Sequence, residues 1–200
     1  MTQNRVFSFA ALIGLTALAG CTTLGLGDAT PAAPADRALD YLNDDLGNLV
    51  FALDLPTTIL PQPAGSTLTL DASTAANGTR HVQASLTLAD GDAAGGALPP
   101  PATGRTYYFL GASEKDKKGL RDVQKWAKTL PSGAAPVFVL DLAPRLCSNA
   151  PTDPAATNVA VLLALPDGAP LTPLIATEPL ATFLAETGAT TLPACAGHAG

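Results

Sequence analysis

Histidine and carboxylate side chains are the groups in this sequence that could carry acid–base chemistry, and they are few and scattered. The chain has two histidines: His81 begins a predicted strand, and His198 lies near the C-terminus. No G-x-S-x-G elbow, H-E-x-x-H motif, P-loop or G-x-G-x-x-G motif accompanies them. We therefore predict no catalytic residues, no metal site and no cofactor, and we expect that the protein is not an enzyme.

Neighbouring carboxylates could share a proton or bind Ca²⁺. Asp44 and Asp45 are adjacent on a predicted helix, so their side chains point in different directions, and we expect them to be solvated at the helix end. The segment Asp90-Gly91-Asp92 is too short for a calcium loop and is typical of a turn.

Two further aspartates, Asp54 and Asp141, lie inside strongly apolar predicted strands. A buried carboxylate needs a partner, because burying an unpaired charge is costly. Arg145 is close to Asp141 in sequence, so we expect these two residues to form a structural ion pair.

Basic side chains gather on a helix predicted from Ser113 to Leu130. Six of the 11 Lys and Arg residues lie there, although the net charge of the chain is −6. One interpretation is that these residues lie on the solvated side of the helix, where Glu114, Asp116 and Asp122 balance their positive charge. The other is a docking surface for an anionic partner, such as lipid headgroups, an acidic glycan or an acidic protein face. The residues that would form this surface are Lys115, Lys118, Arg121 and Lys125.

The first 21 residues have the organisation of an export signal. Arg5 gives a short positive start, and the uncharged stretch from Val6 to Ala19 is shorter than the roughly 20 residues that a membrane-spanning helix needs. The sequence LAGC at Leu18–Cys21 resembles a bacterial lipobox. The resemblance implies cleavage before Cys21 and acylation of that residue, and two or three acyl chains anchor a protein firmly.

The same resemblance implies a location. Thr22 stands where an aspartate would favour retention in the inner membrane, so we expect a lipid anchor in the outer membrane with the protein facing the periplasm. The expected partners are the membrane itself, through the N-terminal lipid, and an envelope protein or peptidoglycan. An acidic chain is a poor candidate for binding nucleic acid.

Once Cys21 is assigned to the lipid, Cys147 and Cys195 remain. Export places them in an oxidising compartment, where a disulfide is the default. Two free thiols are the alternative, and no second Cys pair or nearby His suggests a metal site. A bridge closing a loop of this length stabilises the fold by roughly 4 kcal/mol through chain entropy.

The sequence divides into three parts. Residues 1–20 are a predicted lipoprotein signal peptide, and residues 21–35, rich in small residues and Pro, are a flexible lipidated tether. Residues 36–200 form one predicted globular α+β domain, with a long Gly- and Pro-rich loop at 91–104. We expect a β-rich antiparallel first half, then strand–helix–strand, further strands and a C-terminal helix.

Alternation of apolar and polar residues predicts the strands. The first three, at 48–55, 66–71 and 81–88, form an antiparallel unit with a turn at Asn77-Gly78. Three more are expected at 106–111, 136–142 and 158–165. The inward side chains of the third strand are expected to be Val82, Ala84, Leu86 and Leu88.

Helical spacing predicts a short helix on each side of the basic helix. Asp36 would cap the first, Gly47 would end it, and Leu39, Leu42 and Leu46 would form its apolar face. Thr177 would cap the last. Its predicted buried side chains are Leu180, Phe183 and Leu184. In the basic helix, which Ser113 would cap, the predicted apolar face is Leu120, Val123, Trp126, Ala127 and Leu130.

The strand–helix–strand segment from Thr106 to Leu142, with YYF, the Ser113 helix start, Leu120 and PVFVL, resembles the beginning of outer-membrane-protein-A-like peptidoglycan-binding domains. In that family, an Asp at the next strand end and an Arg on the following helix grip the diaminopimelate group, and Asp141 could stand at the first place. The sequence then departs, because PRLCSNAPTDPAATN cannot form that helix. No ligand residues are therefore carried over.

These observations favour a lipid-anchored envelope protein with a non-enzymatic role in structure or assembly. The alternative is a module that binds peptidoglycan or an anionic glycan or lipid.

Overall fold

The computed structural model describes residues 38–94, 98–131, 133–165, 172–186 and 188–196. The predicted signal peptide, Cys21, the tether and His198 lie outside the described residues. Those described form a seven-stranded sheet in which every pairing is antiparallel, in the order β5-β2-β3-β4-β1-β6-β7. The strands are β1 (Val50–Pro56), β2 (Ile59–Thr74), β3 (Gly78–Leu88), β4 (Arg105–Ala112), β5 (Val137–Ser148), β6 (Asn158–Ala164) and β7 (Thr172–Pro179).

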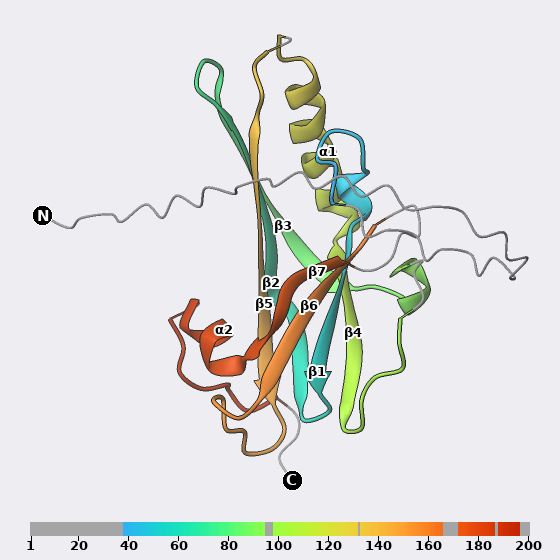
Figure 1. The fold of residues 1–200 in the computed structure, drawn as a ribbon, viewed down its shortest axis with the longest axis vertical. Helices are drawn as coiled ribbons and strands as arrows, with labels where there is room; N and C mark the ends of the chain where they lie inside the picture. Colours follow the sequence, from blue (N-terminus) through green and yellow to red (C-terminus); the bar gives the residue numbers. More distant parts are fainter. Residues whose placement is uncertain (1–37, 95–97, 132, 166–171, 187, 197–200) are drawn as a thin grey trace, which may run out of the picture. The chain divides into compact units, whose positions relative to one another are not determined.

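The sheet is curled, so that its two edge strands approach each other. Residues Leu140–Leu142 of β5 and Leu174–Ala176 of β7 line opposite sides of one surface groove. Figure 1 shows β7 passing in front of β5. Helix α1 (Glu114–Lys128) packs on β3, and the short α2 (Leu180–Glu186) packs on β6 and β7. The fold is thus mostly antiparallel β with few helices.

Strand β1 lies in the interior of the sheet and is buried on both faces. Its predicted inward residues, including Phe51 and Leu53, are at most 2% exposed. On the other face, Val50 packs with Ala94 of the 3₁₀ helix η2 (Gly91–Ala94) and with Ala164 of β6. The start of the predicted 91–104 loop therefore has a packing role.

The hairpin of β2 and β3 is longer than the sequence indicates. Thr74 pairs with Gly78, so the loop contains only the three residues between them, and Gly78 has a positive φ of 78°. Of the four inward residues predicted for β3, Ala84 and Leu86 are buried, but Leu88 is 61% exposed. The prediction for Leu88 is wrong because this strand end borders an open surface groove.

The first predicted helix is wrong. Asp36 lies outside the described residues, and the segment after it forms a turn followed by the 3₁₀ helix η1 (Leu46–Asn48). Asp40 Oδ1 accepts hydrogen bonds from the backbone N–H groups of Leu42 and Asn43. Such local side-chain bonds compete with the helical pattern of the backbone.

The last predicted helix exists, but it begins later. Thr177 belongs to β7, a strand that the sequence pattern does not predict, and α2 starts at Leu180. The N–H groups of Leu180 and Ala181 donate to the carbonyls of Thr157 and Pro154, so contacts with another loop fix the helix start. Leu180, Phe183 and Leu184 are buried as predicted.

Candidate functional site

The predicted basic helix is present as α1, with Ser113 as its N-cap and Thr129 as its C-cap. The Ser113 hydroxyl does not cap the backbone; it donates to Asp116 Oδ2 at 2.8 Å. The same oxygen accepts from the Ser85 backbone N–H at 2.8 Å. The hydrogen bonds from Ser85 and Ser113 lower the pKa of Asp116. One carboxylate therefore joins the start of α1 to β3.

An ion pair joins α1 to the N-terminal segment. Arg121 Nε lies 2.8 Å from Asp45 Oδ1, and a second guanidinium nitrogen lies 2.9 Å from Asp45 Oδ2. Asp45 Oδ1 also accepts from the Gly47 N–H at 3.0 Å. The hydrogen bonds from Arg121 are the largest cause that lowers the pKa of Asp45. Asp45 is therefore an anchoring residue, and the prediction that it is only solvated is wrong.

The lysines of α1 differ in their surroundings. Lys117 pairs with Glu114 at 2.6 Å. Lys118 and Lys125 both lie beside Asp122, Lys125 at 3.8 Å, and the hydrogen bond from Lys118 lowers the pKa of Asp122.

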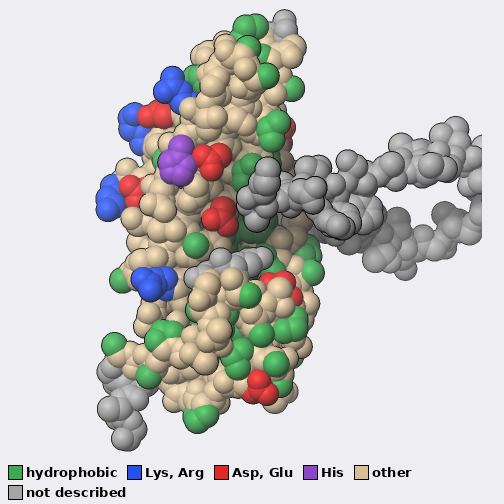
Figure 2. Space-filling view, turned by 90° about the vertical axis from the view of Figure 1, so that its left-hand side faces the viewer, with side chains coloured by type: hydrophobic (Ala, Val, Ile, Leu, Met, Phe, Trp, Pro, Cys, Tyr) green, Lys and Arg blue, Asp and Glu red, His purple; other side chains and the backbone are tan. Residues whose placement is uncertain are grey.

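Lys115 and Lys128 are exposed and form no ion pair with any described residue. Figure 2 shows basic side chains beside acidic ones on one face of the protein. The predicted surface consists of Lys115, Lys118, Arg121 and Lys125. Of these four, only Lys115 forms no ion pair with a described residue.

The apolar side of α1 carries one polar residue that the sequence analysis missed. Gln124 is 8% exposed, and its Nε2 donates to the carbonyls of Tyr41 and Asp44 at 3.0 and 2.6 Å. The Tyr41 ring stacks on Phe138 of β5, with centroids 4.9 Å apart. The sequence does contain a signal for this contact. An amide side chain within a stripe of apolar residues must be hydrogen-bonded, since buried polar groups need partners.

The candidate acid–base residues do not converge. Asp54, Asp141 and His81 lie on β1, β5 and β3, and no two of these strands are neighbours in the sheet. His81 is paired with Asp71 across the β2–β3 hairpin, with 2.8 Å between Nδ1 and Oδ1. Asp90 directly precedes the 3₁₀ helix η2, and its Oδ1 accepts from the N–H of Asp92 within that helix.

The two aspartates within strands, Asp54 and Asp141, have different surroundings. Asp54 is partly buried and has a partner, Arg105, whose Nε lies 2.8 Å from Asp54 Oδ1. Asp141 is exposed on the edge strand β5 and, among the described residues, forms no ion pair with Arg145. The predicted Asp141–Arg145 pair is therefore wrong, because an exposed carboxylate is solvated by water and needs no partner.

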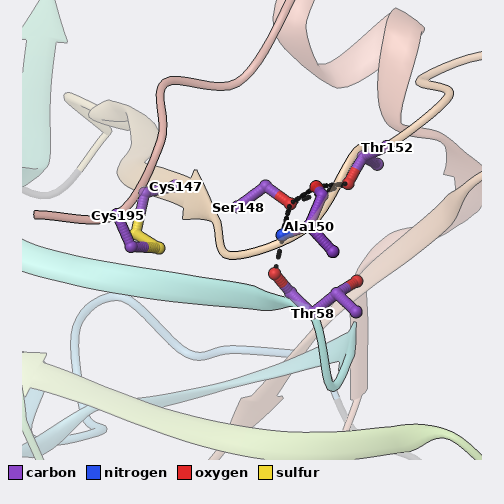
Figure 3. The surroundings of a disulfide bond; sticks show 6 residues. All are labelled: Thr58, Cys147, Ser148, Ala150, Thr152 and Cys195. Atoms are coloured by element: carbon purple, nitrogen blue, oxygen red, sulfur yellow. Dashed lines mark hydrogen bonds between the residues drawn. A yellow bond between two sulfur atoms is a disulfide. The ribbon is translucent and has the colours of Figure 1, made fainter. Parts of the chain in front are cut away.

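Cys147 and Cys195 form the predicted disulfide, with Cα atoms 4.9 Å apart. Cys147 lies within β5, and the C-terminal segment runs beside the end of that strand through a parallel bridge between Ser148 and Ala194. Figure 3 shows that the hydroxyl of Ser148, the residue after Cys147, points away from the disulfide and is hydrogen-bonded to Ala150 and Thr152. The bridge therefore ties the C-terminal segment to a hydrogen-bonded corner of the sheet.

The Asp45–Arg121 pair predicts a pH dependence of stability. Because folding lowers the pKa of Asp45, its contribution is present above the unfolded value of about 3.9 and is lost as the pH falls through the folded value. Both side chains are more than a third exposed, so we expect less than about 1 kcal/mol. Urea unfolding at pH 6 and pH 3 should show a smaller loss of stability for Asp45→Asn than for the wild type. The exposed Asp92→Asn is the control, and equal losses in the wild type and Asp45→Asn would contradict the prediction.

The described residues contain no group of three or more His, Cys, Asp or Glu side chains that could hold a metal ion. No helix in this part of the chain is both long and apolar enough to cross a membrane. Comparison of the chain with protein families, with curated proteins and with solved structures finds no match in any of the three.

Proposed function

We propose that this protein is a lipid-anchored component of the bacterial cell envelope, held at the outer membrane through Cys21, with a non-enzymatic role in structure or assembly. The observation that carries the proposal is the sequence LAGC at the end of the uncharged stretch Val6–Ala19. The Cys147–Cys195 disulfide supports it, because stable disulfides belong to oxidising compartments such as the periplasm.

Metabolic labelling with a palmitate analogue in a Gram-negative host tests the anchor. We expect label on the wild-type chain and none on Cys21→Ser, because only the Cys21 thiol is available for the diacylglyceryl group. The matched control is a Cys147→Ser/Cys195→Ser chain, which should keep the label. Label on Cys21→Ser, or none on the wild type, would rule the anchor out.

A second candidate function is docking of an anionic envelope polymer or lipid headgroup on α1. The exposed Lys115 and Lys128, which pair with no described acid, favour it, and Lys118 and Lys125 share the single carboxylate of Asp122. The excess positive charge would attract a polyanion and would be screened by salt.

A pull-down with purified peptidoglycan separates the two candidates. Binding through α1 should weaken in Lys115→Ala and be lost in Lys115→Ala/Lys118→Ala/Lys125→Ala. The matched control is Lys117→Ala, which removes a neighbouring lysine already paired with Glu114. Equal retention of the wild type and the triple variant would exclude α1 as the docking surface.

A further inference from the structure

The long strands β2 and β5 are interrupted by a bulge. Gln62 pairs with Arg145 and Thr67 pairs with Ala143, so four residues of β2 stand opposite one residue of β5. Ser66 is fully buried within the bulge, where its hydroxyl donates to the Gln62 carbonyl at 2.6 Å and accepts from the Arg145 N–H at 2.8 Å. Bulges redirect side chains and are frequent beside functional sites.

The stem of Arg145 lies against this bulge. Gly65 has a φ of +87°, and a Cβ at this position would lie 2.8 Å from Arg145 Cδ. The glycine thus allows the backbone turn and leaves room for the arginine stem. Within the described part of the chain, the Arg145 guanidinium has neither an ion pair nor a hydrogen bond. Arg145 is exposed, so water solvates its guanidinium, and the contact with Gly65 leaves that group open to a ligand.

Arg145 borders a pocket of about 290 Å³ between the bulge, α2 and the C-terminal segment. Most of the other lining residues are apolar, among them Leu146, Phe183 and Leu192, and Arg145 is the only charged residue among those described. A mostly apolar pocket with few polar groups is the usual composition of a small-molecule site.

The outer wall of this pocket is fixed in place. Thr191, Leu192 and Pro193 form it, and the Pro193 carbonyl accepts from the Ser148 N–H at 2.9 Å. Two residues later, Cys195 is bonded to Cys147 (Figure 3). A wall held by the disulfide means that the cavity exists before a ligand enters, so little binding energy is lost in ordering it.

We propose that this pocket binds a small aliphatic carboxylate, with the chain among Leu146, Phe183 and Leu192 and the carboxylate on the Arg145 guanidinium. The planar guanidinium matches a carboxylate in a two-point hydrogen bond. One cation balances the single charge of a carboxylate, whereas the second charge of a phosphate monoester would stay unpaired. At roughly 30 Å³ for each water-sized group, the volume suits about ten non-hydrogen atoms. The site is separate from α1 and does not depend on the proposed lipid anchor.

Titration calorimetry with octanoate tests the proposal on the full chain carrying Cys21→Ser, a change that removes any competing acyl group. We expect saturable binding of one octanoate per chain. Octanol, which keeps the chain but lacks the charge, should bind at least about tenfold more weakly, because a charge-assisted hydrogen bond is lost. This comparison uses no variant of the pocket and so does not depend on a variant folding.

Arg145→Met should also weaken octanoate binding about tenfold or more, since it keeps an apolar stem over Gly65 and removes the guanidinium. The matched control is Arg80→Met, which removes an arginine that lies over Trp126, 5.6 Å from its ring centroid; it should leave the affinity unchanged. The proposal is overturned if octanoate does not saturate the wild-type pocket, if octanol binds as tightly, or if folded Arg145→Met binds like the wild type. None of these results bears on palmitate labelling of Cys21.

Discussion

Replacing both Cys147 and Cys195 with alanine is expected to lower the free energy of unfolding by about 4 kcal/mol. The two residues are 48 positions apart, and opening a loop of this length returns about that much chain entropy to the unfolded state. Both side chains are buried, at 3% and 8% exposure, so the change also removes packed sulfur atoms. For a chain of this size, the melting temperature should fall by about 10 °C.

Urea unfolding of the double variant, in oxidising buffer, measures this effect. The control is the wild-type chain in excess reductant, which should unfold at a urea concentration between those of the variant and the oxidised wild type, because it lacks the bridge but keeps the packed sulfur atoms. If the variant and the oxidised wild type unfold at the same midpoint, the disulfide does not contribute to the stability of the folded state.

Leu120→Ala is the second change with a large expected effect, about 2 to 5 kcal/mol of lost stability. Leu120 is fully buried on the apolar face of α1 and belongs to the main core, together with residues of β1, β2 and β3. Truncation removes apolar contacts and leaves a cavity between the helix and the sheet, which a close-packed interior cannot readily fill.

The matched control for Leu120→Ala lies on the same helix. Lys118→Ala replaces an exposed side chain that pairs only with the exposed Asp122, so its effect should stay within about 0.5 kcal/mol. Thermal unfolding followed by far-ultraviolet circular dichroism compares the two. Equal small effects would mean that α1 does not depend on the core for its attachment.

Much of the fold was predictable because its local patterns agree with its packing. Strand β1 alternates clearly, and α1 has a helix start, an apolar stripe and Pro131 after its end. Predictions from the sequence pattern were wrong where local side-chain hydrogen bonds, or contacts with residues far away in the sequence, determine the structure. Asp40 binds its own neighbouring backbone and prevents a helix. The start of α2 is fixed by carbonyls of the loop before β6, which no helical period reveals.

The electrostatic partners were less predictable than the elements. The sequence indicates that Asp54 needs a partner, but Arg105 is 51 positions away, and Arg121 is 76 positions from Asp45. Such pairs depend on strand order. For Asp141 the prediction was wrong in the opposite direction: its apolar neighbours in the sequence suggested that the side chain is buried, but it is exposed. Its strand is an edge of the sheet, where Val137 and Val139 are 63% and 55% exposed as well.

The attachment of the N-terminal segment to α1 has a mechanical consequence. The described chain enters the fold through Tyr41–Asp45, where Gln124 holds two backbone carbonyls and Arg121 holds the carboxylate of Asp45. A pulling force on the chain before Tyr41 would act on all of these hydrogen bonds at the same time, before the force reached β1. The helix, itself seated on β3, would distribute that load into the centre of the sheet, so that no single edge strand would be peeled away.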